Sequence, residues 1–257
     1  MRPESIGIIG GTGRMGQWLK KFLEGAGYQV IVAGRKTEIS PKELASLCDV
    51  VIVSVPIKDT VNIIKEIGPY VRPEAVLMDV TSIKKGPVEA MLSYSSSEVI
   101  GTHPLFGPSA PSIKRQIVVI CPARTKVWLP WLKELLLTHK VKITISTPEK
   151  HDEMMAIVQG ISHFFLLTMG LIVKESTFNL REFSDYSTPF FHIILRKMQH
   201  FLHQNPEMCA SIQFNSYHKI SRFLESVDEL KKIIKDQDYQ KFYQIFQKLN
   251  EIPFPEE

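Results

Sequence analysis

The 257-residue sequence predicts an α/β fold in which a doubly wound, mostly parallel sheet is followed by an all-α helical C-terminal region. Short apolar runs alternate with amphipathic stretches through the first ~145 residues, the pattern of βαβ units. A glycine-rich turn follows the first apolar run, and strand-like runs stop near residue 147. We therefore expect two domains, at residues 1–146 and 147–257.

The expected strands of the first domain are short, apolar and bounded by turn residues. They cover Ser5–Gly10, Gln29–Ala33, Val50–Val55, Ala75–Asp79, Glu98–Gly101, Gln116–Cys121 and Lys142–Ile145. The expected helices between them are amphipathic. They cover Arg14–Gly25, Pro41–Leu47, Thr60–Ile67, Pro87–Leu92 and Lys126–His139.

The second domain is expected to contain only helices, separated by Ser/Thr-Pro and Asn-Pro loops. They cover His151–Ile172, Pro189–Gln204, Ser211–Lys232 and Asp236–Asn250. The first of these is apolar on most of its circumference, so we expect it to be buried against other helices or a second subunit. We expect no membrane span, because polar residues interrupt this helix and no apolar run approaches ~20 residues. Those polar residues are Asp152, Glu153, Gln159 and His163.

Composition narrows the classes of function. The net charge is +4, but Lys and Arg are spread along the chain without a run of five or more. Nucleic acid is therefore not an expected partner, whereas a small anionic ligand is compatible. Cys48, Cys121 and Cys209 lie far apart and lack metal-ligand spacing, so we expect no metal site and a reducing, cytoplasmic location. No secretory leader is recognised at the start of the sequence.

The glycine-rich turn has the pattern Gly11-x-Gly13-x-x-Gly16 and lies between an expected strand and an expected helix. That order is typical of Rossmann-type dinucleotide-binding domains. We expect Gly11 to permit the tight turn, Gly13 to admit a pyrophosphate to the helix N-terminus, and Gly16 to let helix and strand pack closely. Thr12, Arg14 and Met15 complete this expected cofactor-binding segment.

The end of the second strand indicates which dinucleotide binds. NAD-binding domains usually place an acidic residue there, but the sequence has Arg35, Lys36 and Thr37. Two cations and a hydroxyl complement a 2′-phosphate, so NADP is favoured over NAD. The alternative is that these are solvated charges and that Glu38 binds the ribose of NAD. The third strand ends in Ser54, Val55 and Pro56, which we expect to pass over the nicotinamide ribose.

Two further polar segments follow strands at the same carboxyl edge of the expected sheet, where open α/β folds bind ligands. One is Asp79–Pro87, with Ser82 and Lys84; the other is Gly101–Pro108, with His103. The Pro/Gly-rich surroundings of His103 predict neither helix nor regular strand. A lone histidine more often ends a strand and bonds locally, but Ser82 and Lys84 beside it favour catalysis.

Several motifs together resemble the prephenate dehydrogenase family, the NAD(P)-dependent enzymes of tyrosine biosynthesis. The similarity is greatest to the form fused to chorismate mutase in enteric bacteria, and it covers nearly the whole chain. The motifs are Gly10-Gly-Thr-Gly-Arg-Met-Gly16, Val51-Ile-Val-Ser-Val-Pro-Ile57, Thr81-Ser-Ile-Lys-Lys-Gly-Pro87, His103-Pro-Leu-Phe-Gly-Pro108 and His151-Asp-Glu-Met-Met-Ala-Ile-Val-Gln-Gly-Ile-Ser-His-Phe164.

The resemblance implies oxidative decarboxylation of prephenate to 4-hydroxyphenylpyruvate. His103 would be the base or acceptor at the ring hydroxyl, a role that suits imidazole because its pKa lies near operating pH. Ser82 would hydrogen-bond the same hydroxyl or His103. His163 and Lys84 would contribute to the pocket for this dicarboxylate. His151 and His163 lie just over three helical turns apart, so they cannot both touch one small molecule, and we expect His151 to be structural.

The sequence departs from the family where an arginine usually clamps a substrate carboxylate. His200 stands at that place, and the nearest arginine, Arg196, lies one turn earlier on the same helix face. Either residue would make the contact, or Arg196 is a solvated charge. The departure leaves prephenate and arogenate, which bears an amino group, as alternative substrates.

The resemblance also implies a homodimer formed by the helical domain. No chorismate mutase-like segment is recognised in the sequence, and neither an association with a separate mutase nor inhibition by tyrosine is predicted. Two alternatives remain: another two-domain NADP oxidoreductase acting on a different small acid or imine, and a non-catalytic NADP-binding regulatory or scaffold protein. The first leaves the His103 and His151–Phe164 motifs unexplained, and Ser82, Lys84 and His103 together argue against the second.

Overall fold

The computed structural model describes residues 2–254, which form two compact units. The first contains the residues up to Met155 together with Gln204–Ile212. The second contains Ala156–His203 and the residues from Gln213 onward. Relative to the expected ranges 1–146 and 147–257, residues 147–155 and 204–212 are thus grouped with the first unit. One reason is that the helix beginning at Pro148 packs against the first unit and hydrogen-bonds to it through Asp152.

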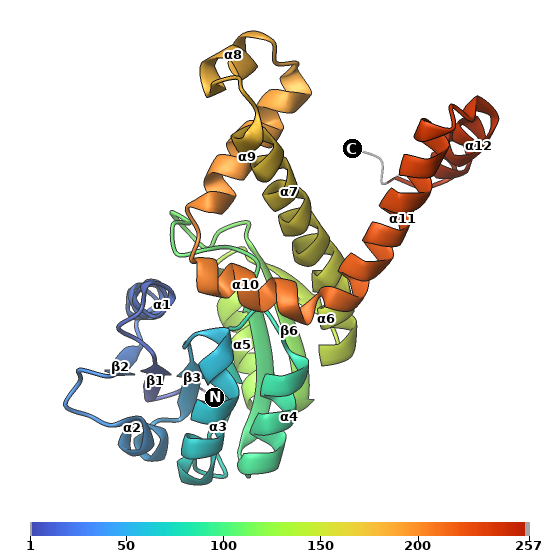
Figure 1. Cartoon of the computed structure of the whole chain (residues 1–257). Coiled ribbons are helices and arrows are strands. Elements are labelled where there is room, and N and C mark those ends of the chain that lie inside the picture. The colour runs from blue at the N-terminus through green and yellow to red at the C-terminus, as the bar shows by residue number, and fades with distance from the viewer. Residues whose placement is uncertain (1, 255–257) are drawn as a thin grey trace. The chain divides into compact units, whose positions relative to one another are not determined.

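The first unit contains a seven-stranded sheet with the order β2-β1-β3-β4-β5-β6-β7. Figure 1 labels β1, β2, β3 and β6 of this sheet. The strands are β1 Ser5–Ile9, β2 Gln29–Ala33, β3 Val50–Val53, β4 Val76–Asp79, β5 Glu98–Pro104, β6 Ile117–Arg124 and β7 Lys142–Ile145. All neighbours are parallel except β5 and β6. The order reverses between β1 and β3, and ligands of doubly wound sheets bind beyond the carboxyl ends of strands at such a point. The predicted fold class is confirmed.

Helices cover both faces of this sheet. They are α1 Arg14–Gly25, α2 Pro41–Leu47, α3 Ile57–Ile67, α4 Lys85–Tyr94, α5 Trp128–Thr138 and α6 Pro148–Met155, with a short 3₁₀ turn at Gly68–Tyr70. Along β3, Val50 and Ile52 belong to one apolar cluster, whereas Val51 and Val53 belong to another. Because alternate residues of a strand point to opposite faces, both faces are buried, which explains the continuous apolar run.

The histidine-bearing segment corrects one expectation. Strand β5 continues through His103 to Pro104, and these residues pair with Val119 and Val118 of the antiparallel β6. The expected strand ended at Gly101. Proline is tolerated at a strand end because no backbone N–H is needed there for the sheet. The strand can continue to Pro104 because β6 pairs with this part of β5. His103 is therefore on a rigid strand, 3% exposed, rather than in a loop.

The second unit is helical. It contains a π-helical turn at Ala156–Ile161, then α7 Ser162–Glu175, α8 Leu180–Asp185, α9 Pro189–Leu202, α11 Tyr217–Lys235 and α12 Tyr239–Asn250. Between α9 and α11, α10 (Pro206–Asn215) begins in the first unit. The single helix expected over Ser211–Lys232 is thus two helices. The sequence analysis missed α8, although Asn179 and Glu182 form a capping box that marks its start.

Helix α7 has no buried residue within the single chain, so burial against other helices of the same chain, one of the two expected alternatives, is not found. Leu171 and Ile172 are 58% and 57% exposed. Among the described residues, Pro148–Glu175 is long and apolar enough to cross a membrane by length and composition alone. Its length and apolar composition are thus sufficient for a membrane span, despite the polar residues that were expected to exclude one. Cover from a second subunit, the other part of the expectation, stays a prediction.

Candidate active site

The glycine-rich turn joins β1 to α1 by close backbone contacts. Gly10, which lies just before the Gly11-x-Gly13-x-x-Gly16 pattern, has a positive φ of 81°, and a Cβ there would lie 2.3 Å from the Ser54 carbonyl oxygen. A Cβ on Gly11 would lie 2.6 Å from the Val32 side chain. A Cβ on Gly16 would lie 2.4 Å from the Gly10 oxygen, which is the close packing expected of that residue. The turn therefore depends on glycine at all three positions.

The N-terminus of α1 fits a pyrophosphate. Gly13 is the N-cap, no side chain caps the helix, and its first turn holds no acidic residue. A Cβ on Gly13 would approach only the Gly10 oxygen, at 3.3 Å, so the exposed space in front of the helix is open. Free N–H groups and the helix dipole favour an anion at such a terminus. The residues present, Thr12, Arg14 and Met15 among them, thus fit a dinucleotide.

The end of β2 lies against this turn. A Cβ on Gly34 would lie 2.7 Å from the hydroxyl of Thr12, so the two segments touch. The Thr37 hydroxyl accepts a hydrogen bond from Gly34 N and lies 2.9 Å from the Ile39 carbonyl oxygen, so it closes the loop after β2. Arg35 and Lys36 are exposed and form no ion pair with any residue that the structure describes. Both cations are therefore available to an anionic group near Thr12.

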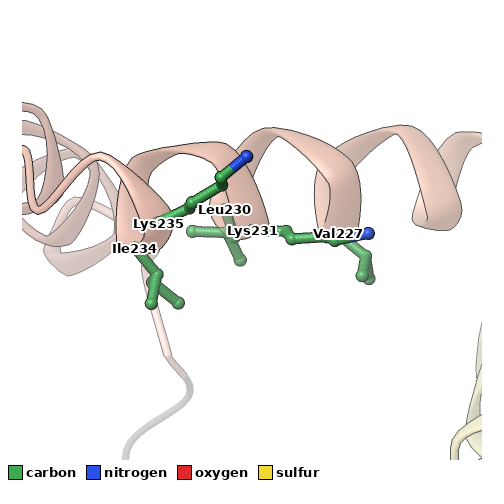
Figure 2. A pocket seen from close by; sticks show the side chains of 5 residues that line it. All are labelled: Val227, Leu230, Lys231, Ile234 and Lys235. Atoms are coloured by element: carbon green, nitrogen blue, oxygen red, sulfur yellow. The ribbon is translucent and has the colours of Figure 1, made fainter.

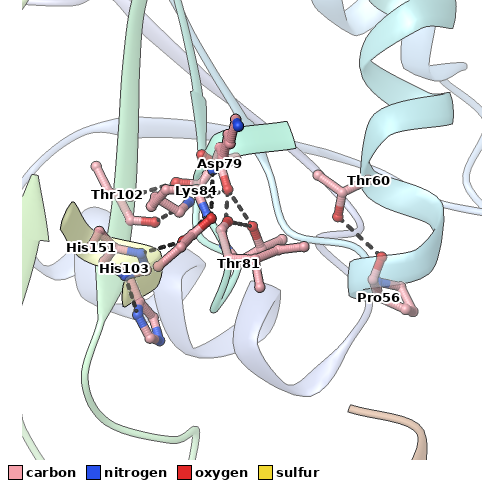
Figure 3. Close-up of polar contacts among 11 residues, drawn as sticks. Pro56, Thr60, Asp79, Thr81, Lys84, Thr102, His103 and His151 are labelled. Carbon is pink, nitrogen blue, oxygen red and sulfur yellow. Dashed lines mark hydrogen bonds and ion pairs between the residues drawn. The ribbon is translucent and has the colours of Figure 1, made fainter. Parts of the chain in front are cut away.

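The end of β3 lies beside the same turn. Ser54 N donates to the Ile9 carbonyl oxygen at 2.8 Å, which joins the ends of β3 and β1. Val55 and Pro56 lead directly into α3, and the Thr60 hydroxyl donates to the Pro56 carbonyl oxygen at 3.0 Å (Figure 3). The expected cofactor-binding segments after β1, β2 and β3 are thus brought together at one edge of the sheet.

Gly16→Ala is expected to weaken dinucleotide binding by roughly tenfold or more, which corresponds to about 1.4 kcal/mol. The added methyl group would meet backbone atoms of Gly10 and Gly11, which cannot move without displacing the turn. Titration calorimetry or cofactor fluorescence measures the effect. Gly25→Ala at the other end of α1 is the control, because a Cβ there meets nothing within 4 Å. Equal affinities of Gly16→Ala and the unmodified protein would contradict this account of the turn.

A buried ion pair underlies the second polar segment. The Lys84 ammonium contacts Asp79 Oδ2 and donates to the Thr102 carbonyl oxygen at 2.7 Å (Figure 3). The Thr81 hydroxyl donates to the same Asp79 oxygen at 2.5 Å. Lys84 and Asp79 are both 0% exposed. Burial lowers the pKa of Lys84, and Asp79 opposes that shift. The ammonium expected to face the substrate is therefore enclosed, and it acts on its surroundings as a fixed internal charge.

His103 lies within this polar cluster and is bonded to His151 on α6. Its Nδ1 lies 2.9 Å from His151 Nε2 (Figure 3). Burial, followed by Lys84 and His151, holds the pKa of His103 well below its ordinary value. The imidazole is therefore uncharged at neutral pH, the form that accepts a proton. Ser82 is half-buried and makes no hydrogen bond to His103 in the described part of the chain.

Sequence reasoning treated His151 as a structural residue and so missed its contact with His103. The two lie 48 residues apart, and no spacing rule connects a strand end to a helix at that separation. The signal available was the His151-Asp152 pair at the start of an expected helix, directly after the last strand. Its partner could be identified only once β5 and α6 were placed together.

The segment after His103 is fixed to the nucleotide-binding helix. Phe106 packs on Trp18 of α1 with ring centroids 4.9 Å apart. The Trp18 indole N–H donates to the Ala110 carbonyl oxygen at 2.8 Å. These contacts tie the chain beyond β5 to α1, so the position of His103 is set by the same elements that form the dinucleotide site.

The remaining predicted site residues lie in the second unit. His163 on α7 is half-buried, its ring lies 4.7 Å from that of Phe201, and burial lowers its pKa. His163 Nδ1 is enclosed without a hydrogen-bond partner among the described residues. Arg196 and His200 on α9 are exposed, and Arg196 forms no ion pair with any described residue. Their spacing places them on one helix face, so either side chain is free to bind an anion.

Two family models match consecutive parts of the chain. The model described as prephenate dehydrogenase, nucleotide-binding domain, matches residues 27–145. The model described as prephenate dehydrogenase, dimerization domain, matches residues 147–248. The first match begins after the glycine-rich turn, so the geometry of that turn is evidence separate from it.

Curated relatives agree with these matches. A Methanocaldococcus jannaschii protein named "probable arogenate/prephenate dehydrogenase" is 35% identical over 94% of this chain and 59% of its own length. The T-protein of Haemophilus influenzae is 29% identical over 96% of this chain and 66% of its own length. The chain thus spans about three fifths to two thirds of these relatives.

Solved structures share the fold. Prephenate dehydrogenase from A. aeolicus, in complex with hydroxyphenyl propionate and NAD⁺, has a TM-score of 0.75 at 17% identity, covering 97% of each chain. Synechocystis arogenate dehydrogenase has a TM-score of 0.72 at 20% identity, covering 96% of this chain and 97% of the other. The Rossmann-type unit with its buried histidine, the two family-model matches and the 35% identical relative lead to one conclusion: the chain belongs to the prephenate dehydrogenase family.

Proposed function

We propose that the chain is an NAD(P)-dependent dehydrogenase that converts prephenate to 4-hydroxyphenylpyruvate. The observation that carries the proposal is the uncharged, buried His103 on β5, anchored through Phe106 to the helix whose N-terminus fits a dinucleotide. The name of the Methanocaldococcus jannaschii relative supports the same substrate class. Neither a scaffold role nor an unrelated oxidoreductase accounts for this combination.

The chemistry assigned to the chain's own residues is general base catalysis. His103 Nε2 accepts the proton of the ring hydroxyl as the carbon that bears it loses a hydride. The bound nicotinamide supplies the acceptor for that hydride. Carbon dioxide leaves the opposite ring carbon, its bonding electrons make the ring aromatic, and the proton returns to the oxygen to give the phenol. His103 therefore ends in its starting state, and Ser82 would hold the hydroxyl beside it.

The two carboxylates of the substrate need cations or donors. His163, Arg196 and His200 are the residues of the second unit proposed to bind them, and Arg196 has the guanidinium that suits bidentate contact. Arogenate is the second candidate substrate, because the usual arginine position is His200 and because one relative and one structural neighbour carry that substrate in their names.

One assay tests the proposal. The protein is mixed with prephenate or arogenate and with NADP or NAD, and the absorbance of the reduced cofactor is followed. Turnover with prephenate is expected, and the product is identified by mass spectrometry. Turnover with arogenate only would select the second candidate. No turnover with any of the four pairs would contradict both.

NADP is the proposed preferred cofactor, and Arg35→Ala together with Lys36→Ala tests this. The double variant is expected to raise KM for NADP roughly ten- to a hundredfold, since hydrogen bonds to charged groups contribute ~1.5–3 kcal/mol. KM for NAD should change little, because NAD lacks the 2′-phosphate. Lys21→Ala, an exposed lysine on α1, is the control. Equal effects on both cofactors would mean that these cations do not select NADP.

The pH dependence of kcat is expected to reflect the lowered pKa of His103. Activity should persist as the pH falls through 6.5, the ordinary value, and decline only at lower pH. The unfolded chain takes up this proton first, so the stability that neutral His103 contributes is present above 6.5 and is lost as the pH falls toward its folded pKa. Stopped-flow kcat profiles and thermal melts over the same pH range measure both. A kcat profile that declines already at 6.5 would show that His103 is not held uncharged.

We propose a homodimer formed through the helical unit. The matching family model is described as a dimerization domain, and α7 carries the exposed Leu171 and Ile172. On α11, Val227, Leu230 and Ile234 line a shallow apolar hollow with two lysines beside it (Figure 2). Apolar surface of this kind is typical of subunit interfaces. Light scattering should give twice the mass of the chain, and a monomer at micromolar concentration would contradict the proposal.

A further inference from the structure

The orientation of His103 is set by a hydrogen-bonded chain that runs through His151 to Asp152. His103 Nδ1 lies 2.9 Å from His151 Nε2 (Figure 3). His151 Nδ1 lies 2.7 Å from Asp152 Oδ1. The two rings meet at an interplanar angle of 71°. His103 and His151 are 3% and 2% exposed, so water does not compete for the nitrogens that join them. This hydrogen-bonded series, His103–His151–Asp152, is therefore a fixed element of the first unit.

Asp152 is held as an ionised carboxylate. Its two oxygens accept the backbone N–H groups of Lys84 and Lys85 at 2.7 and 2.9 Å. These amides lie at the start of α4, where the helix dipole favours an anion. Burial alone would raise the pKa of Asp152, but hydrogen bonds from His151, Lys85 and Lys84 lower it below its ordinary value. An ionised carboxylate only accepts hydrogen bonds.

The positions of the protons on His151 and His103 follow from the fact that the Asp152 carboxylate only accepts hydrogen bonds. Because Asp152 has no proton to donate, His151 Nδ1 carries the proton that lies between them. A singly protonated His151 then has its lone pair on Nε2, so His103 Nδ1 must donate to it. His103 is uncharged, which leaves its Nε2 without a proton. No residue that the structure describes bonds to that nitrogen.

We propose that His151 and Asp152 are positioning residues that hold His103 in the tautomer whose Nε2 accepts the proton of the substrate's ring hydroxyl. The identity of the hydroxyl rests on the proposed function, whereas the tautomer does not. A second proton on His151 would reverse the hydrogen bond to His103 and place the His103 proton on Nε2, where it would block acceptance. The charged and titratable groups facing His103 are Lys84, from the start of α4, and His151, from α6.

His151 and Asp152 also assist the step in which His103 becomes charged. Burial and the Lys84 ammonium both disfavour a protonated imidazole. When Nε2 accepts a proton, the Nδ1–H of His103 points to His151, whose own N–H points to the Asp152 carboxylate. The Asp152 carboxylate thus stabilises the transiently protonated His103 without contacting the substrate, as the orienting carboxylate of a catalytic triad does.

The first experiment needs no substrate. Protein labelled with ¹⁵N at histidine is examined by long-range ¹H–¹⁵N NMR, which distinguishes protonated from unprotonated ring nitrogens, and the His103 signals are assigned from their loss in His103→Asn. The expected result is a protonated Nδ1 and an unprotonated Nε2 on His103. A protonated Nε2 in the unmodified protein overturns the proposal.

The second experiment uses Asp152→Asn. With its NH2 group in place of Oδ1, the side chain offers an N–H to His151 and keeps its oxygen for the Lys85 amide, while the Lys84 amide loses its acceptor. We expect the proton of His103 to move to Nε2 and kcat to fall roughly 10²- to 10⁴-fold, with a lower Tm from the lost contact to α4 and unchanged cofactor affinity. Asp152→Ser, which removes the carboxylate, should also lose activity, whereas Glu149→Gln, a carboxylate-to-amide change at an exposed position of α6, should not. His151→Gln should retain more activity than His151→Phe, because its amide oxygen still accepts from His103.

The outcomes separate this proposal from the proposed function. An unchanged His103 tautomer and kcat in Asp152→Asn, or full activity in Asp152→Ser, overturns the positioning role. If no dehydrogenase activity is found with any substrate, but His103 has the expected tautomer and changes it in Asp152→Asn, the proposed function fails while the positioning of His103 stands.

Discussion

His103→Asn is expected to lower kcat by about 10²- to 10⁴-fold, the usual contribution of a positioned general base. The amide cannot take the hydroxyl proton, so hydride loss would have to proceed from a carbon that still bears a protonated oxygen. Cofactor affinity should stay the same, because none of the described contacts of the glycine-rich turn involves His103. Steady-state kinetics and cofactor titration measure the two effects separately.

The matched control is His203→Asn, which changes an exposed histidine at the end of α9. It should leave kcat and Tm unchanged. If His103→Asn retained full turnover, the buried imidazole would have to be a structural residue of β5, and another group would have to accept the proton.

Lys84→Met is expected to destabilise the first unit by about 3–5 kcal/mol, the usual cost of leaving one partner of a buried ion pair alone. Asp79 would keep its carboxylate in a site that is 0% exposed, with the Thr81 hydroxyl and backbone N–H as its described remaining donors. Urea unfolding followed by circular dichroism measures the loss.

Two further variants identify the cause. Lys85→Met, one residue away and exposed, should change stability by no more than about 0.5 kcal/mol. The double variant Asp79→Asn with Lys84→Met removes both charges and should recover much of the loss. If Lys84→Met proved as stable as the unmodified protein, Asp79 would have to be protonated in the folded state.

The sheet was predicted closely because each strand is specified by its own residues. In β3, four consecutive apolar residues bury both faces, and such a run has few alternative structures. The boundaries that were missed depend on distant partners. Strand β5 extends to Pro104 only because β6 pairs with it.

Only part of the candidate site was predicted, because some of its features follow from local sequence and others from contacts with distant residues. The glycine-rich turn follows local backbone rules, so its place between β1 and α1 could be predicted, whereas the positive φ of Gly10 was not part of that prediction. The enclosure of Lys84 was not readable, because its partner Thr102 comes from the neighbouring strand β5. The Thr37 hydroxyl closes its own loop by accepting from Gly34 N. This contact was likewise not predicted, because the sequence-based prediction considered only charges and hydroxyls that could bind a 2′-phosphate.

Residue order therefore specified the α/β architecture, the dinucleotide turn and the family, since these follow from short-range periodicity and from motifs of a few residues. The environment of His103 followed from the folded chain alone. Its protonation depends on burial, on the Lys84 charge and on a hydrogen bond from a helix 48 residues away. Electrostatic interactions act through space, so proximity created by the sheet and α6 sets the chemistry of a histidine whose identity the sequence already provides.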